Sequence, residues 1–159
     1  MAKTIYVLRG GFWGWDGMLT SGGMDMLAQR LNNIAPTYIF NWDQSAQVDA
    51  RLATHSGKRI VIGYSGGGWK ASTLESKIDL MVLYDPSPIW KMQLIGTNVK
   101  RCICYHNNAP AFFGYGGAKA KAVNPRLTKI ETHEISEWHP AVQNDERLHK
   151  LTISAVTEL

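Results

Sequence analysis

The segment 58–67 constrains the fold of this chain more than any other part of the sequence. Ile60-Val61-Ile62 is an unbroken apolar run, typical of a strand buried on both faces of a sheet. The glycine-rich turn Gly63-Tyr64-Ser65-Gly66-Gly67 follows at once, and a short helix is predicted over 69–77. A buried strand that turns directly into a helix is the building unit of a parallel sheet covered by helices.

The same alternation of strand and helix continues along the rest of the chain. Apolar runs predict further strands at 4–8, 37–41, 79–84, 99–105 and 127–134, and helical spacing predicts helices over 24–31, 44–54 and 145–159. We therefore expect one α/β domain over 1–159, a three-layer sandwich with a mainly parallel sheet of about six strands. Right-handed crossovers place all strand carboxyl ends at one edge, where ligands bind. The longest irregular stretch is expected at 106–126.

Composition excludes several classes of protein. Hydrophobic residues make up 45% and charged residues 19% of the 159 residues, as in a globular domain. The net charge of +4 is not gathered in a run, so we expect no nucleic-acid partner. There is no apolar stretch long enough to span a membrane and no signal peptide is apparent at Met1–Thr4, so we expect a cytoplasmic protein, with later release left open. Cys102 and Cys104, two apart on a predicted strand, are expected to be reduced and buried.

The turn at 63–67 has the pattern G-x-S-x-G between a buried strand and a helix, which is the setting of a nucleophile elbow. Such a turn lifts the Ser65 hydroxyl above the sheet edge, and the N–H of Gly66 is placed to donate to an oxyanion. Two other interpretations stand beside this one. The glycines are also compatible with a turn that merely packs closely on the sheet, and a phosphate-binding loop is disfavoured because Trp69 separates Gly68 from Lys70.

A serine nucleophile needs a base, and the base needs an acid that orients it. Of the five histidines, His139 lies after the sixth predicted strand and before the last helix, at the correct edge of the sheet. His106 also follows a strand and is the alternative base. Asp85 directly follows the fourth strand, and Pro86 keeps it out of helical geometry. The predicted triad is therefore Ser65, Asp85 and His139, with a simple Asp-Pro turn as the alternative interpretation of Asp85.

The chain resembles a minimal member of the α/β-hydrolase superfamily, of the esterase, lipase and cutinase type. The resemblance rests on Leu8-Arg9-Gly10-Gly11-Phe12, on the elbow at 63–67 and on Trp138-His139-Pro140, and it covers nearly the whole chain. It implies that the family's first two strands are missing and that the six strands are ordered 2-1-3-4-5-6. It also implies a second oxyanion donor, the N–H of Phe12 or of Gly11.

The acid departs from the family's usual pattern. The resemblance places it after the fifth strand, at 105–108, where this sequence has no carboxylate. Some lipases carry the acid one strand earlier in an Asp-Pro context, which Asp85-Pro86 matches. Glu137 is a distant alternative.

The expected function is hydrolysis of a carboxylic ester or thioester through an acyl-enzyme on Ser65. The expected substrate is a small-molecule or lipid-like ester, and no metal or organic cofactor is expected. Aromatic side chains near the expected site predict an apolar pocket, equally compatible with capping of a small core: Trp13, Tyr64, Trp90 and Phe112. The alternatives are a non-catalytic binding module on the same scaffold, and an amidase or acyltransferase of this fold. The oligomeric state is not predicted.

Overall fold

The structure is a computed structural model that describes residues 2–11, 21–87, 92–108 and 116–159. Its centre is a six-stranded sheet in which every pairing is parallel. In spatial order the strands are β2 (Thr37–Phe40), β1 (Lys3–Leu8), β3 (Lys58–Tyr64), β4 (Ile78–Tyr84), β6 (Val99–Asn107) and β8 (Lys129–Ile135). This confirms the predicted sheet and the order 2-1-3-4-5-6 of its strands.

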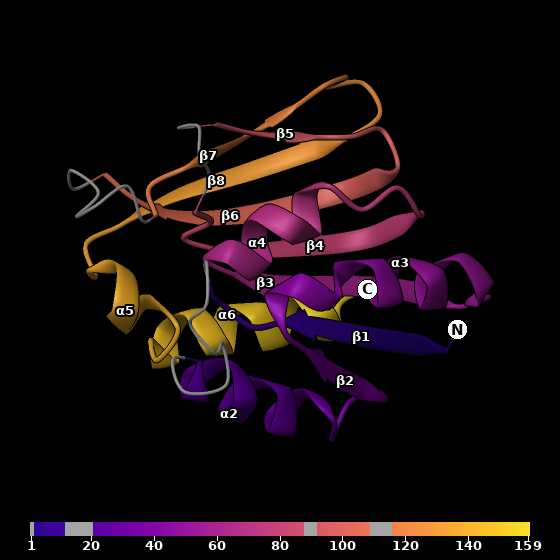
Figure 1. Cartoon of the computed structure of the whole chain (residues 1–159), viewed down its shortest axis with the longest axis horizontal. Coiled ribbons are helices and arrows are strands. Elements are labelled where there is room, and N and C mark those ends of the chain that lie inside the picture. Colours follow the sequence, from indigo (N-terminus) through magenta and orange to yellow (C-terminus); the bar gives the residue numbers. More distant parts are fainter. Residues whose placement is uncertain (1, 12–20, 88–91, 109–115) are drawn as a thin grey trace.

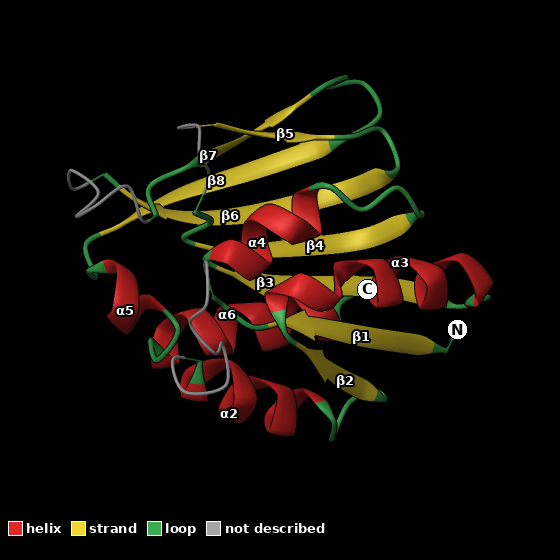
Figure 2. Ribbon diagram, in the orientation of Figure 1, coloured by secondary structure: helices red, strands yellow, loops and turns green. Residues whose placement is uncertain are grey.

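Helices cover both faces of the sheet, as Figures 1 and 2 show. On one face α2 (Gly22–Leu31) and α6 (Glu146–Thr157) pack their apolar stripes against alternate side chains of the strands. On the opposite face lie the short 3-10 helix η1 (Trp42–Gln44), α3 (Ser45–Thr54) and α4 (Gly66–Ser72). The remaining helix, α5 (His139–Val142), is a short turn between β8 and α6. The chain is therefore a three-layer α/β sandwich.

The side chains of β3 and β4 explain why these strands are central. All seven residues of β4 are buried, as are the last five of β3, so neither strand has a face in solvent. Parallel strands covered on both sides bury nearly continuous apolar runs, which is the pattern that the sequence shows here. Cys102 and Cys104 on β6 are both free and buried, and burial raises the pKa of the Cys104 thiol to about 12.

Two elements differ from the sequence prediction. The helix after the elbow spans Gly66–Ser72 rather than the predicted 69–77, so it ends five residues early and begins three residues early. Its start was missed because three successive glycines carry little helix preference and the helix start is set by tertiary packing. The stretch 106–126 is not wholly irregular. Its start, through Asn107, completes β6, and β7 (Lys119–Ala122) pairs with β5 (Met92–Ile95) in a separate two-stranded parallel ribbon. The ribbon lies beside β8 at the edge of the molecule (Figure 1).

Candidate functional site

Ser65 occupies a strained turn between β3 and α4. Its backbone has φ 53° and ψ −122°, and a non-glycine residue at positive φ costs on the order of 1–3 kcal/mol. Three backbone hydrogen bonds hold it there. The Ser65 N–H donates to the carbonyl of Tyr84 at 3.0 Å, and its own carbonyl accepts from the N–H of Ser87 at 3.0 Å and of Trp69 at 3.1 Å. Strand β4, its following turn and α4 thus fix the serine together.

Small residues around Ser65 let two backbones approach closely. A Cβ placed on Gly66 would lie 2.1 Å from the carbonyl oxygen of Gly11, and one on Gly67 would lie 2.4 Å from that of Arg9. The loop after β1 therefore runs directly over the start of α4. Gly10 fixes that loop further, because its N–H donates to the buried Ser21 hydroxyl at 2.9 Å. Only residues without a side chain fit at 66 and 67.

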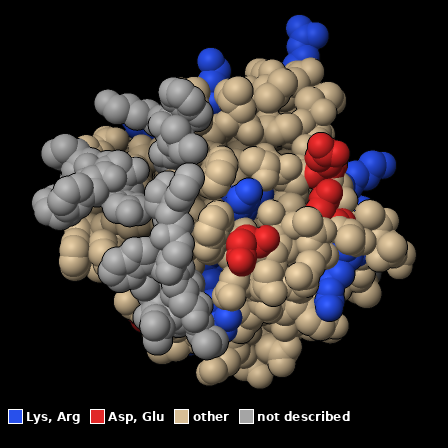
Figure 3. All heavy atoms as spheres, in the orientation of Figure 1, with Lys and Arg blue, Asp and Glu red and all other residues tan. Residues whose placement is uncertain are grey.

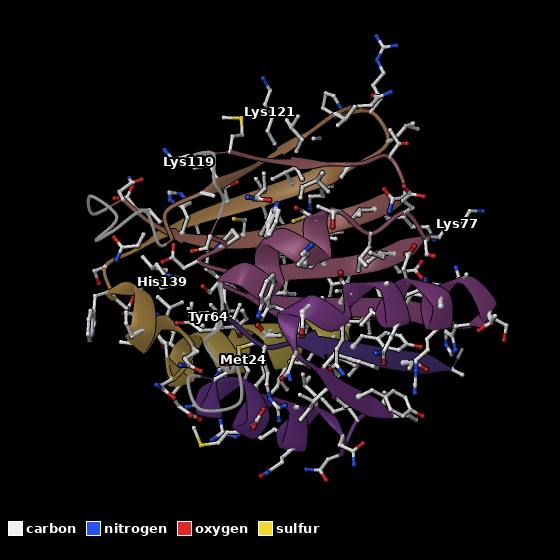
Figure 4. The ribbon with its side chains drawn as sticks, in the orientation of Figure 1. Met24, Tyr64, Lys77, Lys119, Lys121 and His139 are labelled. Atoms are coloured by element: carbon white, nitrogen blue, oxygen red, sulfur yellow. The ribbon has the colours of Figure 1, made fainter. Side chains whose placement is uncertain are left out.

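His139 reaches Ser65 from the first turn of α5. Its Nε2 atom lies 2.9 Å from Oγ of Ser65, although the two residues are 74 positions apart. The imidazole ring stacks on the ring of Tyr64, with centroids 5.3 Å apart, and the Tyr64 hydroxyl donates to the backbone carbonyl of His139 at 3.0 Å. Figure 4 shows the two side chains next to each other at the carboxyl edge of the sheet. Tyr64 thus fixes both the ring and the backbone of His139.

Asp85 completes the chain of hydrogen bonds from the opposite side of His139. Its Oδ2 atom lies 2.6 Å from Nδ1 of His139. Its Oδ1 atom accepts two backbone N–H groups, from Asn107 at 2.9 Å and from Gly117 at 2.7 Å. The residue is fully buried and has φ 40°, a second strained position at this edge. A buried carboxylate needs such partners because burial of an unpaired charge is costly.

These contacts define the protonation pattern of the site. The Asp85 carboxylate only accepts hydrogen bonds, so Nδ1 of His139 carries the proton and donates to Oδ2. Nε2 is then the acceptor that faces the Ser65 hydroxyl. The structure therefore brings together the serine, histidine and aspartate that the sequence proposed from three different strand ends. Their arrangement is suited to withdrawing a proton from the serine.

The structure separates the other proposed acid and base from this site. Glu137 directs its carboxylate to Arg147, 3.3 Å away, rather than to the imidazole that Asp85 holds. His106 lies inside β6, which ends at Asn107, two residues after the predicted end of that strand. The prediction that His106 follows the strand was therefore wrong. Burial, reinforced by the charge of Lys119, lowers the pKa of the His106 imidazole. Among the described residues, Nδ1 of His106 has no hydrogen-bond partner.

Several supporting residues were not found by sequence reasoning. The two donors to Oδ1 of Asp85 are backbone groups of Asn107 and Gly117, and backbone groups carry no sequence signature. The side-chain amide of Asn107 also donates to the carbonyl of Glu137, which ties β6 to the segment that precedes His139. Gly116, at φ +78°, lies against the contact between Asp85 and His139. The Gly116-Gly117 pair was the available signal, because paired glycines in a long loop mark positive φ.

The remaining predicted site residues divide into two groups. Phe12, Trp13, Trp90 and Phe112 lie outside the described residues. Gly11 and Gly66 lie against each other beside Ser65, and Tyr64 is buried beneath Gly10, whose Cβ position is 2.7 Å from the tyrosine ring.

The part of the chain that the structure describes contains no cluster of three or more His, Cys, Asp or Glu side chains able to hold a metal ion. None of its helices is long and apolar enough to cross a membrane.

Comparison of the chain with protein-family models, with curated proteins and with solved structures gives no match. The interpretation of the site therefore depends on its own geometry.

Proposed function

We propose that this protein is a serine hydrolase of the α/β-hydrolase type, which cleaves an ester-type bond through an acyl-enzyme on Ser65. The observation that carries the proposal is the unbroken series from Ser65 Oγ to His139 Nε2, 2.9 Å, and from His139 Nδ1 to Asp85 Oδ2, 2.6 Å. A serine, its base and an orienting acid at these distances form the recurring constellation of nucleophilic catalysis.

Ser65 attacks the substrate carbonyl while Nε2 of His139 takes the hydroxyl proton. The resulting imidazolium lies against the Asp85 carboxylate, which stabilises the positive charge and keeps the ring in place. His139 then gives the proton to the leaving alcohol or thiol, and the acyl group stays on Ser65 Oγ. In the second half, His139 takes a proton from water and the resulting hydroxide attacks the acyl carbonyl. His139 then returns that proton to Ser65 Oγ as the bond between Oγ and the acyl carbon breaks, which releases the acid product and restores the enzyme.

The negative charge of the tetrahedral intermediate requires N–H donors beside Ser65. Gly66 supplies the first, because it is the residue after the nucleophile and starts helix α4. The loop that follows β1 supplies the second, from Gly11 or Phe12. Gly10 is not that donor because its N–H is already bonded to Ser21. Loss of one such donor in other enzymes costs roughly 10²–10³ in kcat.

The geometry favours catalysis over a binding module on the same scaffold. A binding module places no requirement on the relative positions of Ser65, Asp85 and His139, which come from segments 20 to 74 residues apart. It also has no need of positive φ at both Ser65 and Asp85, which is costly and recurs at active sites. Carboxylic esters and thioesters remain the proposed substrates, with a small or lipid-like acyl group.

A fluorophosphonate probe tests the nucleophile directly. We expect covalent labelling of the wild type, complete loss in Ser65→Ala, and unchanged labelling in Ser154→Ala, which changes an exposed serine on α6. Folding of each variant is checked by circular dichroism. A well-folded wild type that takes no label would refute the assignment of Ser65.

A series of p-nitrophenyl esters, with the matching thioester and anilide, then defines the bond. We expect release of nitrophenol from the ester and slower or no cleavage of the anilide, since an amine is a poorer leaving group. Faster cleavage of the anilide than of the ester would instead indicate an amidase.

A further inference from the structure

The charges of this chain are divided unequally along its sequence. Seven of the 17 Lys and Arg residues lie between Asp85 and Glu131, and none of the 13 acidic residues does. The remainder of the chain therefore holds ten basic and thirteen acidic residues. The net positive charge of the protein comes entirely from this one segment, which includes the β5–β7 ribbon.

The outer face of the ribbon combines cationic and aliphatic side chains. Met92 pairs with Lys119 and Leu94 pairs with Lys121, so these four side chains lie on the same face of the two strands. All four are exposed, with Leu94 61% accessible, whereas the alternate residues Gln93 and Ala120 are buried against the molecule. Figure 4 shows Lys119 and Lys121 pointing outward from the ribbon.

The turn that follows β7 carries two further exposed side chains of these two kinds. Val123 is 62% exposed and Arg126 is also exposed. None of the ion pairs among the described residues uses Lys119, Lys121 or Arg126, although other basic residues of the segment are paired, such as Arg101 with Glu131. Along the upper rim of Figure 3, blue atoms project from the surface and no red atoms are visible.

We propose that this ribbon face, defined as Met92, Leu94, Lys119, Lys121, Val123 and Arg126, binds the surface of an anionic lipid membrane. Its cations match lipid phosphates, and their aliphatic stems together with Met92, Leu94 and Val123 match the boundary between headgroups and acyl chains. A nucleic-acid backbone offers phosphates but no apolar region that would cover the exposed aliphatic side chains. A second copy packed on this face would bring like charges together, which disfavours self-association.

The ribbon face begins next to the candidate active site. Gly117, whose N–H donates to Asp85, is two residues before Lys119, and β5 starts a few residues after Ser87, which is bonded to Ser65. The Lys119 end of the ribbon therefore lies close to the strand edge that carries Ser65. Membrane binding itself does not depend on the proposed hydrolysis, and the two are tested separately.

The test is sedimentation of the full chain with vesicles, in a Ser65→Ala background so that hydrolysis plays no part. We expect binding to phosphatidylcholine vesicles containing phosphatidylglycerol, little binding to phosphatidylcholine alone, and weakening as salt rises from 0.1 to 0.5 M. Lys119→Gln with Lys121→Gln should weaken binding about 25-fold, at about fivefold per charge. The matched control is Lys77→Gln with Lys150→Gln, which removes the same charge from exposed positions elsewhere and should leave affinity within about twofold.

The aliphatic part of the face has its own control. Met92→Gln should weaken vesicle binding severalfold, whereas Met26→Gln, at 45% exposure against 46% for Met92, should not. The proposal would be overturned if the two double-lysine variants lost vesicle affinity equally, because net charge alone would then explain binding. It would also be overturned if anionic vesicles do not sediment the protein, if duplex DNA binds it with no sensitivity to Met92→Gln, or if the ribbon variants abolish a dimer instead.

Discussion

Gly116 lies where a single methyl group should disrupt the candidate active site. Its Cβ position is 2.2 Å from Oδ2 of Asp85 and 2.5 Å from Nδ1 of His139, the two atoms that join the proposed acid to the proposed base. Both distances are far below the 3.4 Å at which ordinary contact begins. Gly116→Ala therefore pushes directly on the contact that orients the imidazole.

The size of the effect follows from these distances. To restore contact at 3.4 Å, the separation from the new methyl group must grow by about 1.2 Å for Oδ2 and by about 0.9 Å for Nδ1. Neither atom belongs to a long flexible side chain that could simply turn away. Misplacement of a catalytic group by about 1 Å costs on the order of 10²-fold in rate, which corresponds to about 2.7 kcal/mol. In addition, alanine at φ +78° costs roughly 1–2 kcal/mol of folding stability.

Gly117→Ala separates these two effects. Gly117 has nearly the same φ, +83°, but among the described residues its Cβ position meets only the carbonyl oxygen of Asn107, at 3.0 Å, and its N–H remains available to Asp85. We expect both variants to lose similar stability in thermal unfolding. We expect Gly116→Ala to lose about 100-fold in kcat on p-nitrophenyl acetate and Gly117→Ala less than about tenfold. Equal kcat values in the two folded variants would refute the reasoning.

Three further predictions test the surroundings of the base. His139→Ala should lower kcat about 10³-fold or more, whereas His106→Ala should keep kcat within about an order of magnitude of the wild-type value. A larger loss of kcat in His106→Ala than in His139→Ala would identify His106 on β6 as the base. Tyr64→Phe removes one hydrogen bond to the His139 carbonyl and should lower the unfolding temperature by about 2–4 °C, with a fall in kcat larger than any change in KM. Burial lowers the pKa of His149, whose ring contacts the Gln143 carbonyl at 2.7 Å, so the unfolded chain takes up a proton at a higher pH than the folded chain does. The contribution of His149 to folding stability should therefore be complete above about pH 6.5 and decrease as the pH falls. In thermal unfolding, His149→Gln should reduce the loss of stability between about pH 7 and pH 5.

The sheet could be predicted because its signals are local. The apolar runs at β3 and β4 mark strands buried on both faces, and the helical spacing of α2 and α6 marks the layer that covers them. Ser65, Asp85 and His139 were proposed to lie together because each follows a strand, and the carboxyl ends of parallel strands share one edge. The strand order then followed from the resemblance and is the order observed.

The ribbon and the support of Asp85 could not be predicted in this way. Strand β5 is four residues long and β7 is Lys-Ala-Lys-Ala, a segment with little strand preference that forms only because β5 lies beside it. The N–H groups of Asn107 and Gly117 converge on one carboxylate oxygen from segments that are distant in sequence. Such convergence depends on tertiary contacts and leaves no periodic pattern.

By itself the sequence determined which chemical groups lie at the ends of the strands, because the periodicities of strands and helices depend on residues that are close in sequence. Only the tertiary structure decided which of those groups meet. His139 rather than His106 faces Ser65, and Asp85 rather than Glu137 faces His139. The physical reason is that hydrogen bonds act over about 3 Å, whereas the residues that make these bonds lie 54 and 74 positions apart. Their distances are set by the packing of the whole sheet and not by any local segment.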